Sequence, residues 1–177
     1  RFVVSYPKSD SLEMAAYKSA KSYYELSPRF SLDQKDTYIA LEKLQGFVDN
    51  YPDSQFRAQC NNMVQELKVK LEQKDIETAK QFRRISDYKA AIKAFDNFIQ
   101  DHPGSIYRQD AYFGRLEAAY VLAQNSVSYL VKERLEMAKK YFDSFMKYYS
   151  SSAQRGAAEE ILLKINTQLQ EQTLSTN

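Results

Sequence analysis

The sequence predicts an all-α fold, an α-solenoid of stacked helix pairs with long units. Three observations predict it. The chain has only 4 Gly and 4 Pro among 177 residues, and this composition favours helix. One helical spacing of small and large apolar residues recurs along the chain. Each copy of that spacing is followed by a Pro or a Ser, which marks the end of one helix. Two residues later comes a Ser, which marks the start of the next helix.

The recurring spacing defines the second helix of each pair. An alanine is followed four and seven residues later by large apolar residues, and twelve residues later by the Pro or Ser. Steps of four and three place these side chains on one helix face. The small residue lets a neighbouring backbone approach, and Pro ends the helix because it has no N–H. The three copies are Ala40, Leu44, Phe47 and Pro52; Ala91, Phe95, Phe98 and Pro103; and Ala138, Phe142, Phe145 and Ser150.

The first helix of each pair also repeats. A serine well placed to cap it stands at positions 9, 54, 105 and 152. Six residues beyond each serine the side chain is small, at Ala15, Cys60, Ala111 and Ala158. We therefore interpret Cys60 as a substitute for alanine at a tight helix crossing, since a free buried cysteine behaves as a small hydrophobic residue.

These marks predict the element boundaries. The first helices are expected over residues 10–26, 54–83, 105–124 and 152–170, and the second helices over 34–50, 86–101 and 131–149. Phe2 precedes Pro7 as Phe47 precedes Pro52, so the chain is expected to open inside a further copy. The predicted organisation is the end of an upstream repeat at 1–8, helix-pair repeats at 9–51, 52–102 and 103–149, a C-terminal helix at 150–170 and a frayed tail at 171–177.

The second-helix pattern, Ala-x3-aromatic-x2-large-x4-Pro, resembles that of tetratricopeptide repeats, which form a right-handed superhelix. The units are longer than is usual in that family, and the first helices lack its Trp-Leu-Gly-Tyr pattern. The long units, the turns of the form Tyr-Pro-x-Ser and the segment 66–105 resemble the BamD family of outer-membrane protein assembly lipoproteins. Segment 31–54 is similar to the Bacteroidetes-type members, and the resemblance extends over residues 2–149.

That resemblance implies a scaffold at the periplasmic face of the outer membrane, within the β-barrel assembly machinery. Such a protein would bind the periplasmic domains of BamA and help recruit or insert unfolded outer-membrane β-barrel clients. The lipid-bearing N-terminal cysteine of the family has no counterpart in this chain, because Cys60 is internal. The lipid anchor is therefore expected upstream of residue 1.

The residues offer little for catalysis, so we expect no enzyme. Basic and acidic residues nearly balance, at 25 and 23, which argues against nucleic-acid binding. No Cys and His residues have zinc spacing, and no Gly-rich loop could hold a phosphate, so no metal or cofactor is expected. The only histidine, His102, precedes Pro103 and is interpreted as a helix-end residue. No apolar run is long enough for a transmembrane helix.

Three arginines are candidate partner-binding residues. Arg57, Arg108 and Arg155 each stand three residues after a capping serine, where the positive end of the helix dipole disfavours a cation. One interpretation is that each arginine pairs with an acidic group of the preceding helix, at Asp49, Asp53 or Asp101. The other is a basic ladder along one face that binds an acidic or carboxylate-bearing segment.

Two lysines of the long helix are further candidates. Lys70 could belong to a solvated face with Glu66 four residues before it. In the family that the chain resembles, this stretch meets the last periplasmic module of BamA, and a basic residue at the place of Lys70 takes part. Lys74 is carried over as its neighbour. This helix is two or three turns longer than its partners, so its excess is expected to protrude or to rest on another part of the molecule.

The tyrosines of the first helices leave two interpretations open, packing between units or recognition of a client. They are Tyr17, Tyr23, Tyr24, Tyr107, Tyr112 and Tyr120. A competing function is a tetratricopeptide-repeat adaptor that binds a peptide or a chaperone in another compartment. Adaptors for a chaperone's C-terminal carboxylate need Lys and Asn on adjacent first helices, and that set is absent here. An enzyme would require a catalytic domain upstream.

Overall fold

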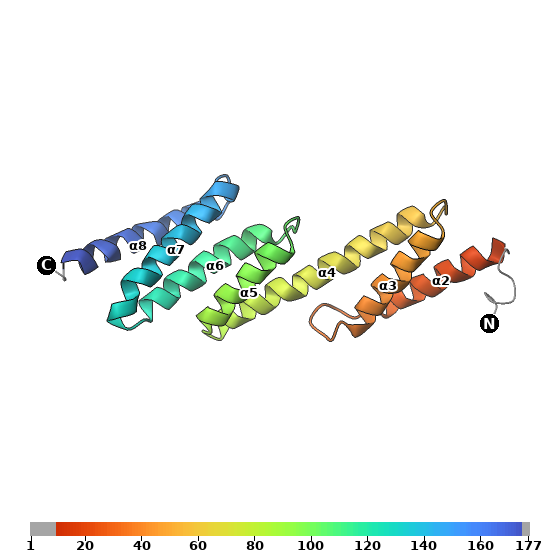
Figure 1. Ribbon diagram of the computed structural model, residues 1–177, viewed down its shortest axis with the longest axis horizontal. Helices are drawn as coiled ribbons and strands as arrows, with labels where there is room; N and C mark the ends of the chain where they lie inside the picture. Colours follow the sequence, from red (N-terminus) through yellow and green to blue (C-terminus); the bar gives the residue numbers. More distant parts are fainter. Residues whose placement is uncertain (1–9, 175–177) are drawn as a thin grey trace. The chain divides into compact units, whose positions relative to one another are not determined.

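The computed structural model describes residues 10–174, and the side chains of residues 12–172. Every regular element in this range is an α-helix, so the all-α fold of helix pairs is confirmed (Figure 1). The helices are α2 (Asp10–Leu26), α3 (Lys35–Asn50), α4 (Arg57–Arg84), α5 (Tyr88–Asp101), α6 (Arg108–Gln124), α7 (Ser128–Tyr149) and α8 (Arg155–Leu174).

The chain divides into two compact units, Arg1–Lys74 and Asp75–Asn177, with the boundary inside α4. In the first unit α2 packs against α3, and the N-terminal part of α4 closes the same apolar core. In the second unit α6 packs against α5, α7 and α8. The division into repeats at 9–51, 52–102 and 103–149 stays a prediction, and segment 1–8 lies outside the described residues.

The core is built from the recurring positions of the second helices, as the spacing predicts. All nine apolar side chains of the three copies are buried, and none is more than 8% exposed. Of the small positions on the first helices, Cys60, Ala111 and Ala158 are fully buried, whereas Ala15 is exposed. Burial raises the pKa of the Cys60 thiol, which fits its role as a small apolar side chain.

The helices that follow the turns begin three residues later than the sequence predicts. Ser54 Oγ accepts a hydrogen bond from the Phe56 N–H at 3.0 Å, and the Ser54 carbonyl accepts one from the Arg57 N–H at 3.1 Å. Equivalent pairs of bonds form at Ser105 and Ser152. Each serine therefore caps a separate single turn, and the arginine begins the α-helix instead of occupying its third position.

Other boundaries match the sequence closely. Ser86 has a positive φ of 64° and ends α4, and Asp87 caps α5 by accepting from the Ala90 N–H at 3.1 Å. His102 is the residue that closes α5, as predicted, and its ring centre lies 4.8 Å from that of Phe98, with the two rings tilted by 47°. Helix α8 continues to Leu174, four residues beyond the predicted end of that helix, because its polar tail consists mainly of good helix formers.

Candidate functional site

Lys70 and Lys74 hold the loop that joins α2 to α3. Lys70 Nζ donates to Ser27 Oγ at 2.9 Å and to the Ser27 carbonyl at 3.4 Å. Lys74 Nζ donates to the carbonyls of Leu32 at 2.8 Å and Phe30 at 3.3 Å. This part of α4 therefore rests on the loop and does not protrude. The two candidate lysines come together at one place, and both are engaged within the first unit.

Buried polar side chains complete this loop. Gln34 is only 3% exposed and donates to the carbonyls of Arg29 and Leu32, both at 2.9 Å. Thr37 is fully buried and donates to Gln34 Oε1 at 2.8 Å. Because the carbonyls of a short loop need donors when water is excluded, the lysines and Gln34 fix the path of the backbone. We call residues 27–34 with Thr37, Lys70 and Lys74 the clamped loop.

The electrostatics of the clamped loop reflect its partial burial. Loss of water around Lys70 lowers the pKa of its ammonium group, while the nearby carboxylate of Glu66 acts in the opposite direction. Glu66 in turn accepts a hydrogen bond from the hydroxyl of Tyr24, and that bond raises the pKa of Tyr24. Two large apolar side chains next to these groups stay exposed, Leu26 by 65% and Leu32 by 50%. The clamped loop thus presents apolar surface beside a held cation.

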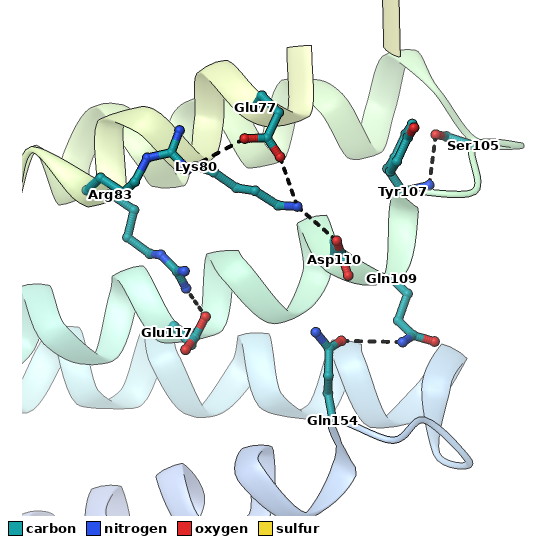
Figure 2. A network of polar contacts seen from close by, with 10 residues as sticks. Glu77, Lys80, Arg83, Ser105, Tyr107, Gln109, Asp110, Glu117 and Gln154 are labelled. Atoms are coloured by element: carbon teal, nitrogen blue, oxygen red, sulfur yellow. Dashed lines mark hydrogen bonds and ion pairs between the residues drawn. The ribbon is translucent and has the colours of Figure 1, made fainter. Parts of the chain in front are cut away.

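A second polar cluster links α4 to α6 in the second unit. Lys80 Nζ lies 3.0 Å from Asp110 Oδ2 and 3.3 Å from Glu77 Oε1, and Arg83 pairs with Glu117 (Figure 2). The side chains of Lys80 and Arg83 are 27% and 35% exposed. We call these five residues the paired face. The sequence alone did not predict the paired face, because pairing between helices depends on how α4 and α6 are rotated about their axes.

Beneath the paired face lies a hollow of about 350 Å³. Its apolar lining comes from Phe95, Phe113 and Gly114. A Cβ atom on Gly114 would come within 2.5 Å of the Phe95 ring, so α5 and α6 approach closely only because this residue is glycine. Gln109 donates to Gln154 Oε1 at 3.4 Å and continues the polar contacts from α6 toward α8 (Figure 2).

The three candidate arginines begin three helices, yet their surroundings differ. Arg57 donates to the carbonyl of Pro52 at 3.1 Å. Arg155 pairs with Glu159 on its own helix, with Nε 2.7 Å from Oε1. Neither contact is the predicted ion pair with an acid of the preceding helix. Arg57 belongs to the first unit and the other two to the second, so a shared ladder stays a prediction.

Arg108 belongs to a cluster of cations and tyrosine rings along α6 and α7. Its guanidinium lies 5.3 Å from the ring centre of Tyr112 and 5.6 Å from that of Tyr148. Arg115 lies 5.0 Å from the same Tyr112 ring, and Lys147 Nζ lies 5.3 Å from the Tyr148 ring. We call these five residues the arginine–tyrosine edge.

One member of the edge is deeply buried and neutralised. Arg115 is 9% exposed, and its Nη1 lies 2.5 Å from Asp96 Oδ1 on α5. The Tyr141 ring lies 4.2 Å from the same guanidinium. Burial, with a contribution from Asp96, raises the pKa of the Tyr141 hydroxyl. The signal for this buried ion pair was present in the sequence, as a single arginine within the apolar run of α6.

Most first-helix tyrosines take part in packing. Tyr17, Tyr112 and Tyr120 are at most 7% exposed, whereas Tyr23, Tyr24 and Tyr107 are half-buried. Within residues 10–174 no group of acidic, His or Cys side chains is arranged to hold a metal ion. None of the described helices is both long and apolar enough to cross a membrane.

Comparison with known proteins places the chain in a family. The family model described as YfiO, outer membrane lipoprotein, matches residues 1–135. The chain belongs to the YfiO family. A curated relative from Caulobacter vibrioides, named outer membrane protein assembly factor BamD, is 26% identical over 125 residues. The match covers 71% of this chain and 41% of the relative, so this YfiO-family chain spans less than half of that protein's length.

Proposed function

We propose that this YfiO-family chain is part of a non-catalytic scaffold in the machinery that assembles outer-membrane proteins. The observation that carries the proposal is the family match over residues 1–135, which includes the clamped loop, the paired face and most of the arginine–tyrosine edge. The name of the Caulobacter relative, a protein assembly factor, supports the same role.

The finer parts of the proposal concern location and partners. The protein acts at the periplasmic face of the outer membrane, where a lipid at the N-terminus of the full-length protein holds it. It binds the periplasmic domains of BamA and helps recruit unfolded β-barrel clients. Helix pairs suit this role because they present side chains from several helices on one surface that another protein can cover.

The clamped loop is our proposed contact for BamA. Its exposed Leu32, together with exposed Leu26 at the end of α2, lies beside the cationic groups of Lys70 and Lys74. Interfaces commonly combine an apolar centre with a polar rim. In this arrangement the lysines do two things. They hold the loop backbone in place, and they keep a positive charge beside its apolar side chains.

The test is co-purification of BamA with the full-length protein from membranes, comparing Lys70→Glu with wild type. We expect the amount of co-purified BamA to fall about tenfold or more, because the substitution reverses a charge and removes the donor to Ser27. Lys68→Glu is the matched control, since Lys68 is exposed on the same helix and changes the net charge equally.

Two outcomes would overturn the proposal at different levels. Unchanged BamA recovery with Lys70→Glu removes the clamped loop from the interface. Absence of BamA from the wild-type complex, with a chaperone or a soluble peptide-bearing partner in its place, favours the adaptor function instead.

A further inference from the structure

Arg108 can be compared with Arg155, an arginine of the same chain at the equivalent position of another helix pair. Arg155 stands at the equivalent position of the next helix pair, three residues after its serine, and pairs with Glu159 four residues further on. Four residues after Arg108 the side chain is Tyr112. The same arginine position therefore takes a carboxylate from its own helix in α8 and an aromatic ring in α6.

Arg108 lacks the neutralising partner that its counterpart has. Its polar contact is a hydrogen bond from Nη2 to the Tyr112 hydroxyl at 3.4 Å. Its Nε is shielded from solvent and has no hydrogen-bond partner among the described residues. A guanidinium stacked on aromatic rings keeps the edge of its planar fork available for hydrogen bonds, and Arg108 thus retains donor capacity.

The surroundings of Arg108 carry a surplus of positive charge. The arginine–tyrosine edge holds three cations, Arg108, Arg115 and Lys147, and its ion pairs include one carboxylate, that of Asp96. Within the described residues neither Arg108 nor Lys147 forms an ion pair. Both cations lie within about 6 Å of the ring centre of Tyr148, at 5.6 Å for Arg108 and 5.3 Å for Lys147, and Tyr148 is 53% exposed.

We propose that the arginine–tyrosine edge binds a carboxylate side chain of a partner protein. The Glu or Asp of the partner would accept hydrogen bonds from the Arg108 guanidinium, as Glu159 does from Arg155. Lys147 adds a second positive charge, and the exposed ring of Tyr148 covers the apolar part of the incoming side chain. The site lies in the second unit, away in sequence from the clamped loop.

A protein carboxylate fits this site better than a lipid phosphate. Five cations of this unit already bind protein carboxylates, each pairing with an Asp or Glu, and they are Lys80, Arg83, Arg84, Arg115 and Arg155. The exposed tyrosine also favours a side chain over a bare headgroup, because tyrosine and arginine are the residues that most often anchor protein interfaces. That the partner belongs to an assembly complex rests on the proposed function. The carboxylate site itself is argued from the contacts of Arg108 and does not depend on that function.

The experiment measures binding of a blocked, dye-labelled peptide, Leu-Glu-Glu-Leu-Glu-Glu-Leu, to the full-length protein by fluorescence anisotropy. We expect Arg108→Gln to weaken binding at least about tenfold, because a hydrogen bond to a charged group is lost. Arg108→Lys keeps the charge without the planar fork and should give an intermediate loss. Arg155→Gln, the matched control, should change binding by less than about twofold, because Glu159 already neutralises that arginine.

A second readout locates the contact. In protein labelled with ¹⁵N-arginine, the Nε–H signal of Arg108 should shift on addition of the glutamate peptide and stay in place with its glutamine analogue. Circular dichroism confirms that each variant is folded. Equal binding of the two peptides, or equal losses from Arg108→Gln and Arg155→Gln, overturns the proposal. Arg108-dependent binding to phosphatidylglycerol vesicles without binding to the peptide also overturns it, in favour of a lipid site.

Discussion

The paired face and the arginine–tyrosine edge both contain lysine and arginine side chains of the second unit, but the groups that contact these cations differ. On the paired face Lys80 and Arg83 of α4 meet Asp110 and Glu117 of α6, so each positive charge has a carboxylate beside it. On the edge the rings of two tyrosines surround Arg108 instead. A cation that is neutralised inside the fold contributes to structure, whereas an unneutralised one remains available to a partner.

This difference separates positions that are equal in the sequence pattern. Arg108 and Arg155 both follow a serine by three residues, and only the residue four positions later distinguishes them. The presence of an arginine in a repeat pattern therefore says little about binding. The identity of its neighbours on the next helical turn says more, because residues four apart face each other on a helix.

The largest expected effect comes from removing Asp96, the carboxylate that pairs with Arg115 of the edge. Asp96→Ala should lower the free energy of unfolding by about 2–3 kcal/mol, because Arg115 is left buried without its partner. Asp96 is itself 26% exposed, which keeps the loss below that of a fully buried pair. Urea denaturation measures it, with exposed Asp101→Ala on the same helix as control. Equal stability of the two variants would show that Arg115 needs no carboxylate, and the contrast with Arg108 would disappear.

The next effect concerns the floor of the paired face. Gly114→Ala should destabilise the protein by about 1–3 kcal/mol, because the new methyl group meets the ring of Phe95 in a closely packed core. Thermal unfolding checks this. Gly156→Ala is the matched control in the same unit, since a Cβ there meets nothing within 4 Å and alanine favours helix. A neutral Gly114→Ala variant would mean that α5 and α6 can separate without cost.

The smallest expected change in stability comes from removing the ion pairs of Lys80 on the paired face. Lys80→Gln should lower the free energy of unfolding by less than about 1 kcal/mol, because its ion pairs are partly exposed, and high salt should remove most of the difference from wild type. Arg108→Gln should leave stability within about 0.5 kcal/mol while it weakens peptide binding. The opposite result, with Lys80→Gln affecting peptide binding and Arg108→Gln affecting only stability, would reverse the roles assigned to the two regions.

Much of the fold followed from the sequence. The second helices and their core were predictable because Ala40, Ala91 and Ala138 begin the same spacing, and that spacing has one helical interpretation. The helix starts were three residues off because Ser54 caps a separate turn that has the same local pattern as a helix start. Boundaries of this kind depend on backbone geometry that residue types do not specify.

The candidate sites were less predictable, for a physical reason. The sequence marked Lys70 and Lys74 as candidates, but it could not show that loop carbonyls from 42–44 residues earlier in the chain lie beside them. Contacts over such separations depend on tertiary packing. The difference between Arg108 and Arg155 is visible in the sequence, since Tyr112 and Glu159 occupy equivalent positions, but the residues alone do not show which side chain each arginine contacts.

Cys60 has a practical consequence of its own. Its side chain is fully buried among the helices of the first unit, and it is the only thiol in this chain. A thiol in that state is slow to react with an alkylating reagent unless the surrounding helices separate. The rate of its modification therefore reports how often the first unit opens, while the second unit, which holds no cysteine, stays silent in the same measurement.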